Sequence, residues 1–221
     1  MNTCAIIVAA GNGRRFNDQV PKQFHLIAGK PVIYYSLKAF VDFNPNCKVI
    51  LVLNKTWIDQ WDKICKTNNI DIDHLVVEGG ESRSESVYNA LEIVEDNACV
   101  MIHDAVRPCL NPELIKKLYE CFLLCGNAVP LLPISEAIRK VKKGKSKWTN
   151  RNHYHSVQTP QLFLSSDLKK AFENNQGIDC CDESELMEKN GAEIHVVPGD
   201  PENIKITYPL DFKLVGLILT Q

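Results

Sequence analysis

A segment near the N-terminus combines glycines and cations in a way that suits phosphate binding. Gly11-Asn12-Gly13-Arg14-Arg15 follows a continuous apolar run at residues 5–10, and Lys22 comes shortly after it. A strand that leads into a glycine turn presents backbone N–H groups, and the three cations add positive charge. These residues alone leave two interpretations open, a polyphosphate site and a solvated basic loop.

Two common phosphate-binding patterns are incomplete in this sequence. Phe16 stands where a dinucleotide-binding fingerprint has its third glycine. Gly144-Lys145-Ser146 lacks the preceding glycine that a P-loop requires. Neither pattern therefore accounts for the N-terminal segment.

Two further polar segments follow apolar runs. Gly79-Gly80 leads into a helix that begins near Ser84, and Asp104 and Arg107 follow the run at residues 99–103. An isolated Asp-x-x-Arg is usually a surface ion pair. Its place after a buried strand favours a functional role, because open parallel sheets bind ligands at that edge.

The elements that must position these residues alternate between apolar strand-like runs and amphipathic helices. Strands are predicted at residues 5–10, 48–53, 75–77, 99–103, 127–133, 193–197 and 204–207. Helices are predicted from Pro31, around the stripe Trp57, Trp61 and Ile64, near Ser84, from Pro112, at residues 166–174 and 182–190, and from Pro209 with Leu210, Leu214 and Leu217. The tryptophan stripe is interpreted as core packing.

This alternation predicts an α/β fold with an open, mostly parallel sheet and helices on both faces. A single domain over residues 1–221 is expected. The alternation is interrupted at about 134–157, where the basic run at residues 140–147 indicates either an arm or a solvated surface hairpin. Every unusual segment outside this interruption falls at the carboxyl end of a predicted strand.

Five motifs resemble those of the 2-C-methyl-D-erythritol 4-phosphate cytidylyltransferase family. They are Ala9-Ala10-Gly11-Asn12-Gly13-Arg14-Arg15 with Pro21-Lys22-Gln23, Gly79-Gly80-Glu81-Ser82-Arg83-Ser84-Glu85-Ser86-Val87, His103-Asp104-Ala105-Val106-Arg107-Pro108, Gln158-Thr159-Pro160-Gln161, and Asn203-Ile204-Lys205-Ile206-Thr207. Five motifs in this order are more specific than any one of them. The resemblance implies a Rossmann-like fold of the nucleotide-diphospho-sugar transferase type. It also implies cytidylyl transfer from CTP to a sugar-alcohol phosphate, with release of diphosphate.

The resemblance implies a role for each matching residue. Four cations are implied as catalytic, with Arg15 and Lys22 at the triphosphate and Arg151 and Lys205 at the acceptor phosphate. The implied substrate-binding residues are Ala9, Ala10, Gly11, Gly13, Gly80, Glu81, Arg83, Ser86, Asp104, Ala105, Arg107 and Thr159. Mg²⁺ is the implied cofactor, held mainly by the CTP phosphates with Asp104 as protein ligand. The arm at about 134–157 is implied to embrace a second subunit of a homodimer.

Two departures from the family concern the acceptor. The family often has Thr-Asp where this chain has Cys181-Asp182, and Asp-Ser or Asp-Thr where it has Glu136-Ala137. A thiol cannot replace the strong hydrogen bond of a hydroxyl. Besides 2-C-methyl-D-erythritol 4-phosphate, an intermediate of isoprenoid precursor synthesis, ribitol or ribulose 5-phosphate therefore remains an alternative acceptor. A non-catalytic nucleotide-binding scaffold is the third alternative, although a scaffold needs none of the four cations.

Composition agrees with a globular enzyme. The 221 residues are 45% hydrophobic and 24% charged, with a net charge of −2, so neither nucleic acid nor a membrane is an expected partner. The absence of a bilayer-length apolar run and of a basic signal-peptide start predicts a cytoplasmic location. The nine cysteines contain no CxxC pair and are expected to be reduced, with Cys180-Cys181 the pair expected to be exposed.

Overall fold

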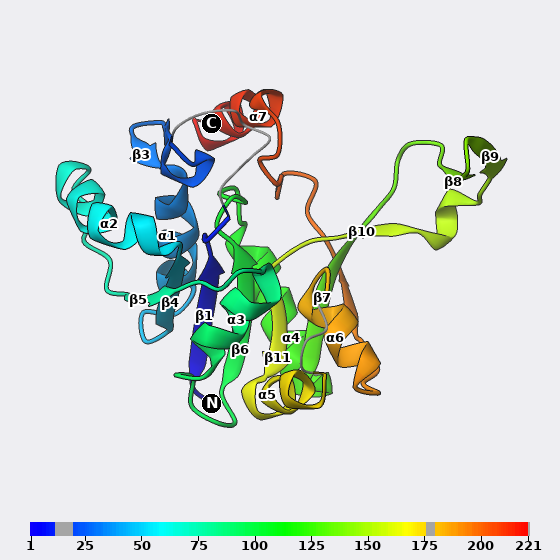
Figure 1. The fold of residues 1–221 in the computed structure, drawn as a ribbon, viewed down its shortest axis with the longest axis horizontal. Coiled ribbons are helices and arrows are strands. Elements are labelled where there is room, and N and C mark those ends of the chain that lie inside the picture. The colour runs from blue at the N-terminus through cyan, green and yellow to red at the C-terminus, as the bar shows by residue number, and fades with distance from the viewer. Residues whose placement is uncertain (12–19, 176–179, 221) are drawn as a thin grey trace.

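A central sheet forms the middle layer of the computed structural model, which describes residues 1–11, 20–175 and 180–220 (Figure 1). Its strands are β1 Thr3–Val8, β4 Lys48–Leu53, β5 Leu75–Glu78, β6 Cys99–Asp104, β7 Asn127–Pro133, β10 His155–Val157, β11 Gln161–Leu164 and β12 Val196–Pro198. They run in the order β10-β7-β11-β6-β1-β4-β5, and β12 pairs with β7. β6, β1, β4 and β5 are mutually parallel, as are β12 and β7, whereas β11 and β10 pair antiparallel with their neighbours. The predicted α/β fold with a mostly parallel sheet is confirmed.

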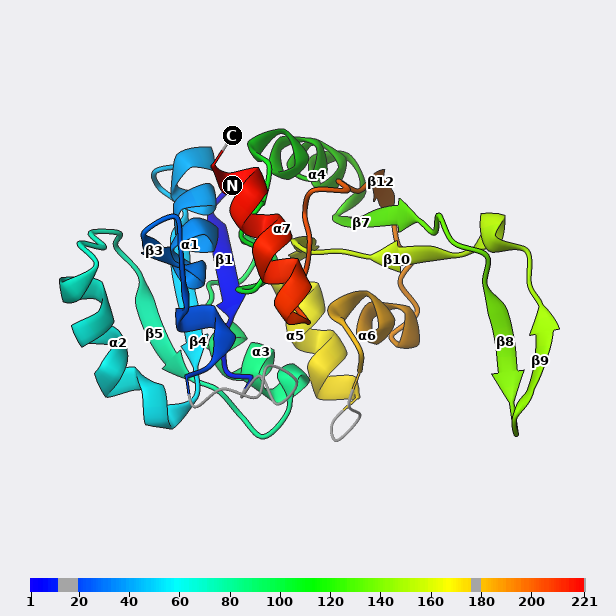
Figure 2. The ribbon, with the colours of Figure 1, turned by 90° about the horizontal axis from the view of Figure 1, so that it is seen from above.

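Helices cover both faces of this sheet (Figure 2). They are α1 Val32–Phe43, α2 Lys55–Thr67, α3 Arg83–Leu91, α4 Pro112–Cys125, α5 Ser165–Asn174, α6 Glu183–Lys189 and α7 Pro209–Leu219. Because side chains alternate along a strand, β1 sends Ala5 and Ile7 into a core shared with α1, α2 and α4. Cys4 and Ile6 enter the opposite core, with α3, α5 and α6.

The tryptophan stripe of α2 packs inward, as predicted. Asn54 caps the helix by accepting a hydrogen bond from the Thr56 backbone N–H. Trp61 is buried, and the Trp57 ring stacks on Phe24 with 4.6 Å between centroids. These ring contacts hold α2 against the core beside the carboxyl end of β4.

Two strand predictions differ from the structure. Residues 204–207 are not a strand, because their backbone groups bond scattered partners instead of one neighbouring strand: Ile206 N–H donates to Val106 O at 2.9 Å, and Thr207 N–H donates to the Asp211 carboxylate at 2.8 Å. The four-residue strand β11 was not predicted, although Leu162 and Phe163 are fully buried. Four residues are too few for the alternating pattern to be distinctive.

The C-terminal helix α7 forms where predicted but turns a different face to the core. Val215 is buried and Phe212 packs beside it. Leu210, Leu214 and Leu217 are exposed instead. The helix is apolar on more than one face, so the spacing of its leucines did not identify the buried side.

The cysteines are all free thiols. Cys181 is exposed as expected, but Cys180 is buried, where its backbone carbonyl accepts from the Ser84 hydroxyl at 3.2 Å. Within the described part of the chain, no helix combines the length and the apolar character needed to cross a bilayer.

The interruption at about 134–157 is an arm that projects from the sheet (Figures 1 and 2). Its outer part is a two-stranded hairpin of β8 Arg139–Lys142 and β9 Lys145–Trp148. Every residue of both strands is exposed, including Val141 and Trp148. The 3₁₀ turn η2 Arg151–His153 and strand β10 lead the chain back to β7.

Candidate active site

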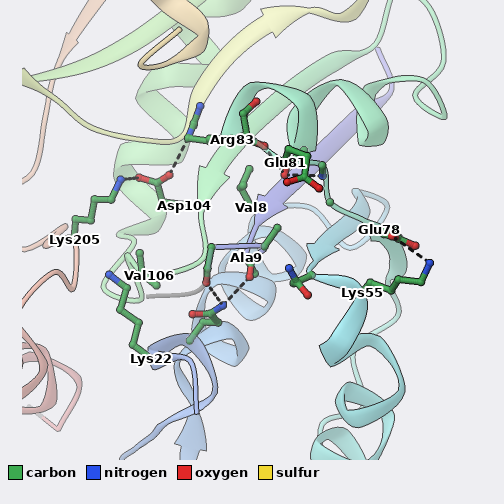
Figure 3. Close-up of a pocket in the computed structure, with 18 residues that line it drawn as sticks. Val8, Ala9, Lys22, Lys55, Glu78, Glu81, Arg83, Asp104, Val106 and Lys205 are labelled. Carbon is green, nitrogen blue, oxygen red and sulfur yellow. Dashed lines mark hydrogen bonds and ion pairs between the residues drawn. The ribbon is translucent and has the colours of Figure 1, made fainter. Parts of the chain in front are cut away.

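A pocket of about 730 Å³ opens at the carboxyl ends of β1, β4, β5 and β6 (Figure 3). Parallel strands place their carboxyl ends on one edge, so segments far apart in sequence meet there. Ten of the predicted site residues line this pocket: Ala9, Ala10, Gly11, Lys22, Gly80, Glu81, Arg83, Ser86, Asp104 and Lys205. Four of the five motifs thus contribute residues to one cavity, and the motif at residues 158–161 does not line it.

The glycine loop after β5 packs tightly against the loop after β1. A Cβ on Gly79 would lie 2.4 Å from the Ala10 Cβ, so only glycine allows the two loops to approach this closely. The Ser86 hydroxyl accepts from Gly80 N–H at 3.1 Å and donates to Ser82 O at 2.8 Å. Ser86 therefore fixes the shape of the loop that lines the pocket.

Gln23 holds the loop after β1 from the other side. Its buried amide donates to the carbonyls of Ala9, at 2.7 Å, and Gly11, at 2.9 Å. Lys22, the first residue of the 3₁₀ turn η1 Lys22–Phe24, lines the pocket and donates through Nζ to Ile206 O. Short polar contacts thus place this lysine between the β1 loop and the segment that carries Lys205.

Asp104, at the end of β6, lies among three cations. Its Oδ2 is 2.9 Å from Lys205 Nζ and 3.4 Å from Arg107 Nε, and its Oδ1 is 3.5 Å from Arg83 Nε. Burial alone would raise the pKa of Asp104, but the charges of Arg83, Lys205 and Arg107 outweigh burial and hold this pKa well below its usual range. A fixed carboxylate thus orients Lys205, whose side chain remains 45% exposed toward the pocket.

A buried hydrogen-bond chain supports Asp104 from behind. The Asp104 backbone N–H donates to Thr159 Oγ1 at 3.0 Å, and Thr159 Oγ1 lies 3.0 Å from His103 Nδ1. Because the Arg107 carbonyl can only accept, His103 Nε2 donates to it, and the Thr159 hydroxyl donates to Nδ1. Burial lowers the pKa of His103 to about 4 against the opposing pull of Asp104, so the ring is neutral.

Three predicted substrate-binding residues lie behind the pocket wall. Ala105 is fully buried, and Thr159 is occupied by the chain just described. Arg107 is buried, donates to Asn203 O at 2.9 Å, and has its pKa lowered by burial. In this structure they hold Asp104 and its neighbours in place rather than line the cavity.

Three predicted site residues remain: Gly13, Arg15 and Arg151. Gly13 and Arg15 lie outside the described residues. Arg151 is exposed at the base of the arm, where its Nη1 donates to Ser135 O, and it does not line the cavity. Within the described residues of one chain, the site contains Lys22 and Lys205 but not Arg151.

Sequence reasoning missed several residues of the site. Asn54 and Lys55 line the pocket after β4, a position that the carboxyl-end rule could have identified. Gln23 belonged to a recognised motif but was not assigned a role. Glu183 bonds both terminal nitrogens of Arg83, at 2.6 and 3.0 Å. No local pattern in the sequence connects Glu183 with Arg83, because α6 follows α3 at long range.

The donor set around Asp104 suits a magnesium ion that arrives with its substrate. No cluster of three or more His, Cys, Asp or Glu side chains that could hold a metal occurs among the described residues. Mg²⁺ often binds through one or two carboxylates plus substrate phosphates. The carboxylate of Asp104, which lines the pocket together with Glu78 and Glu81, fits such a shared site.

Comparisons with known proteins agree along the whole chain. The model of the family described as 2-C-methyl-D-erythritol 4-phosphate cytidylyltransferase matches residues 3–221. A relative of that name from Bacteroides fragilis is 38% identical over 215 residues, 97% of this chain and 98% of the relative. One from Bacteroides thetaiotaomicron is 36% identical over 219 residues, 99% of this chain and 100% of the relative.

Solved structures extend the likeness to the fold. The 2-C-methyl-D-erythritol 4-phosphate cytidylyltransferase of Francisella tularensis superposes with a TM-score of 0.83 at 30% identity, covering 99% of this chain and 100% of that chain. The Thermus thermophilus structure of the same name gives 0.83 at 26%, with full coverage of both chains.

The glycine-lined pocket at the carboxyl edge of the sheet, together with these likenesses, defines an enzyme of the nucleotidyltransferase class with a Rossmann-like fold. Within that class, the chain belongs to the 2-C-methyl-D-erythritol 4-phosphate cytidylyltransferase family.

Proposed function

We propose that residues 1–221 form one catalytic domain that transfers a cytidylyl group from CTP to 2-C-methyl-D-erythritol 4-phosphate, for isoprenoid precursor synthesis. The observation that carries the proposal is the convergence of a glycine loop with Lys22 and Lys205 in one pocket. In this reaction an acceptor phosphate oxygen forms a bond to the α-phosphorus of CTP. The bond from that phosphorus to the leaving diphosphate breaks.

The cations of the pocket reduce the repulsion between the negatively charged substrates of this reaction. Two anions must meet, and charge builds on the α-phosphoryl oxygens and on the leaving diphosphate. Lys22, with Arg15, stabilises the triphosphate. Lys205, which is held by its ion pair with Asp104, positions the acceptor phosphate. The attacking phosphate is already anionic, so no protein base is needed to generate a nucleophile.

The loops supply nucleotide selectivity. The backbone of Ala9, Ala10 and Gly11 binds the phosphates and ribose, while Gly80, Glu81 and Ser86 define the wall for the base. The family resemblance assigns Gly13 to substrate binding as well. Fixed backbone donors and acceptors distinguish cytosine from uracil, because a wrong base leaves buried polar groups unpaired. CTP is therefore expected to give a far higher kcat/KM than UTP or ATP.

The proposed cofactor is Mg²⁺, with Asp104 as its protein ligand. When bound, the ion neutralises phosphate charge and fixes the geometry of the triphosphate. Asp104 remains ionised because three cations surround it, so it can share its oxygens with a metal without first losing a proton. Arg83 and Arg107 keep the carboxylate oriented toward the cavity.

The proposal includes a homodimer in the cytoplasm. Arg151 lies on the projecting arm and not in the pocket of its own chain. It therefore acts at the acceptor phosphate of the partner subunit, and the exposed Val141 and Trp148 of the arm pack on that subunit. Ala105, Arg107 and Thr159 contribute to substrate binding through their support of Asp104.

The test is diphosphate release by the purified enzyme with Mg²⁺, CTP and one acceptor at a time. The highest kcat/KM is expected with 2-C-methyl-D-erythritol 4-phosphate, with ribitol 5-phosphate and ribulose 5-phosphate as matched alternatives. A higher kcat/KM with either pentose-derived acceptor would reassign the substrate. No diphosphate from any of the three would favour the scaffold alternative.

A further inference from the structure

Arg83 lies between two buried carboxylates, Glu183 and Asp104, and gives more of its N–H donors to Glu183 than to Asp104. Its terminal nitrogens Nη1 and Nη2 bond Glu183 at 2.6 and 3.0 Å, whereas its Nε lies 3.5 Å from Asp104 Oδ1. Arg83 and Asp104 line the pocket, but Glu183 does not. The two terminal nitrogens of the guanidinium are therefore bonded to a residue that does not line the cavity. Only Nε, whose contact is the longest of the three, pairs with Asp104 (Figure 3).

Glu183 is held firmly enough to fix this orientation. Its side chain is 1% exposed, and it begins α6 directly after the capping residue Asp182. The neighbouring Ser184 N–H donates to the buried Gln161 Oε1 at 3.0 Å, which ties the start of α6 to β11. A buried carboxylate is costly unless it is paired, and Arg83 is its ion-pair partner in the structure.

The orientation matters because Arg83 and Lys205 share one carboxylate. The shortest ion pair of Asp104 is to Lys205, at 2.9 Å. A guanidinium that turned its fork toward Asp104 would bind both carboxylate oxygens, which a lysine cannot match in geometry. Arg83 would then compete with Lys205 for Asp104.

We propose that Glu183 is a positioning residue that keeps the Arg83 fork outside the pocket and thereby leaves Asp104 free to hold Lys205 at the acceptor site. This inference rests on the proposed role of Lys205 in binding the acceptor phosphate. Glu183 touches no substrate and acts only through Arg83. Its ion pair with Arg83 also connects α3, the helix that follows the glycine loop, to the start of α6.

The first test is Glu183→Gln, which keeps the size of the side chain but removes its charge. The KM for the acceptor phosphate is expected to rise about tenfold, with the KM for CTP little changed, because one charge-assisted positioning contact is lost. A crystal structure of the variant is expected to show the Arg83 fork on Asp104 and Lys205 displaced. This structural readout does not depend on turnover, so it separates a failure of this inference from a failure of the proposed reaction.

Two backgrounds distinguish positioning from general stabilisation. In Arg83→Lys, which has no fork, adding Glu183→Gln is expected to change the acceptor KM by less than about twofold. In Lys205→Ala, adding Glu183→Gln is likewise expected to have little further effect. An undiminished effect in either background would overturn the inference, as would an Arg83 fork that stays turned from Asp104 in the Glu183→Gln structure.

A second variant covers the case in which Glu183→Gln does not fold. Glu183→Asp keeps the charge but shortens the reach, so it is expected to raise the acceptor KM by less than Glu183→Gln. Its KM for CTP is expected to match that of the unmodified enzyme. An acceptor KM unchanged by Glu183→Asp, in a variant whose crystal structure shows the Arg83 fork detached from residue 183, would contradict the proposed role.

Discussion

The pocket and the arm use positive charge in opposite ways. At the pocket, one buried carboxylate is surrounded by Arg83 and Lys205, which line the cavity, and by Arg107 behind its wall, with N–O distances of 2.9 to 3.5 Å. On the arm, the residues of β8 and β9 are all exposed. Cations held by a buried carboxylate are preorganised before a substrate arrives, whereas solvated cations must be ordered when they bind.

Because of this difference, the structure of one chain supports the role of Lys205 more directly than the role of Arg151. A preorganised group can be assigned from its contacts, as Lys205 can from its ion pair with Asp104. The Arg151 side chain donates to the carbonyl of Ser135 on its own arm and does not line the pocket. In the proposed homodimer, the role of Arg151 therefore depends on what the arm contacts in the partner subunit.

The largest expected effect lies in the pocket. Lys22→Ala should lower kcat by ~10²–10³, the usual loss when one preorganised stabiliser of transition-state charge is removed. CTP binding should remain measurable by titration. Lys63→Ala is the matched control, because Lys63 is exposed on α2 and does not line the cavity. Near-normal kcat in Lys22→Ala would remove Lys22 from the catalytic set.

The second prediction uses the buried chain behind Asp104. The pKa of His103 is about 4 in the folded protein against an ordinary 6.5. The unfolded chain therefore takes up this proton first as pH falls, and the stabilisation that is complete above about pH 6.5 is lost toward pH 4. The free energy of unfolding should fall by about 2 kcal/mol between pH 7 and pH 5, measured by urea denaturation.

A variant of the buried histidine tests this assignment. His103→Gln should flatten the pH dependence, because it removes the group whose pKa differs between the folded and the unfolded chain. A pH dependence that persists in His103→Gln would assign the effect to other groups.

The alternation of strands and helices predicted most of the fold because buried parallel strands carry continuous apolar runs. β1, β4 and β6 are of this kind, and each was predicted within a few residues. β11 was missed because four residues give no distinctive pattern, and residues 204–207 were misassigned because alternating apolar and polar residues do not guarantee a strand partner. Local sequence thus predicts elements better than their pairing.

For the site as well, local features could be predicted from the sequence and long-range contacts could not. Loops that follow predicted strands contained Gly80, Asp104 and most other pocket residues, because strand ends define the binding edge. The contact between Glu183 and Arg83 spans distant elements and has no local signature. The packing of Thr159 behind Asp104 likewise depends on the antiparallel insertion of β11, which was not predicted.

A third prediction addresses the arm directly. Arg151→Ala should raise the KM for the acceptor phosphate about tenfold and leave the KM for CTP little changed, because it removes positioning of one substrate. Lys143→Ala is the matched control, since Lys143 lies at the exposed turn of the hairpin. If Arg151→Ala altered only the CTP constant, the division of cations between the two substrates would be wrong.

The smallest expected effect concerns how the arm meets its partner. Residues 139–148 carry six cations and no acid, so within a chain of net charge −2 the remaining residues carry −8. Attraction between solvated charges is screened by salt, with a Debye length of about 10 Å at 0.1 M. The dissociation constant of the proposed dimer, measured by analytical ultracentrifugation, should therefore rise a few-fold between 50 and 300 mM NaCl.

Replacing Lys140 and Lys147 with alanine should weaken the dimer at low salt and reduce this salt dependence. The control variant Lys22→Ala, in the pocket, should leave both the dissociation constant and its salt dependence unchanged. A salt dependence that is identical with and without the two lysines would show that the apolar residues of the arm, and not its charges, hold the partner.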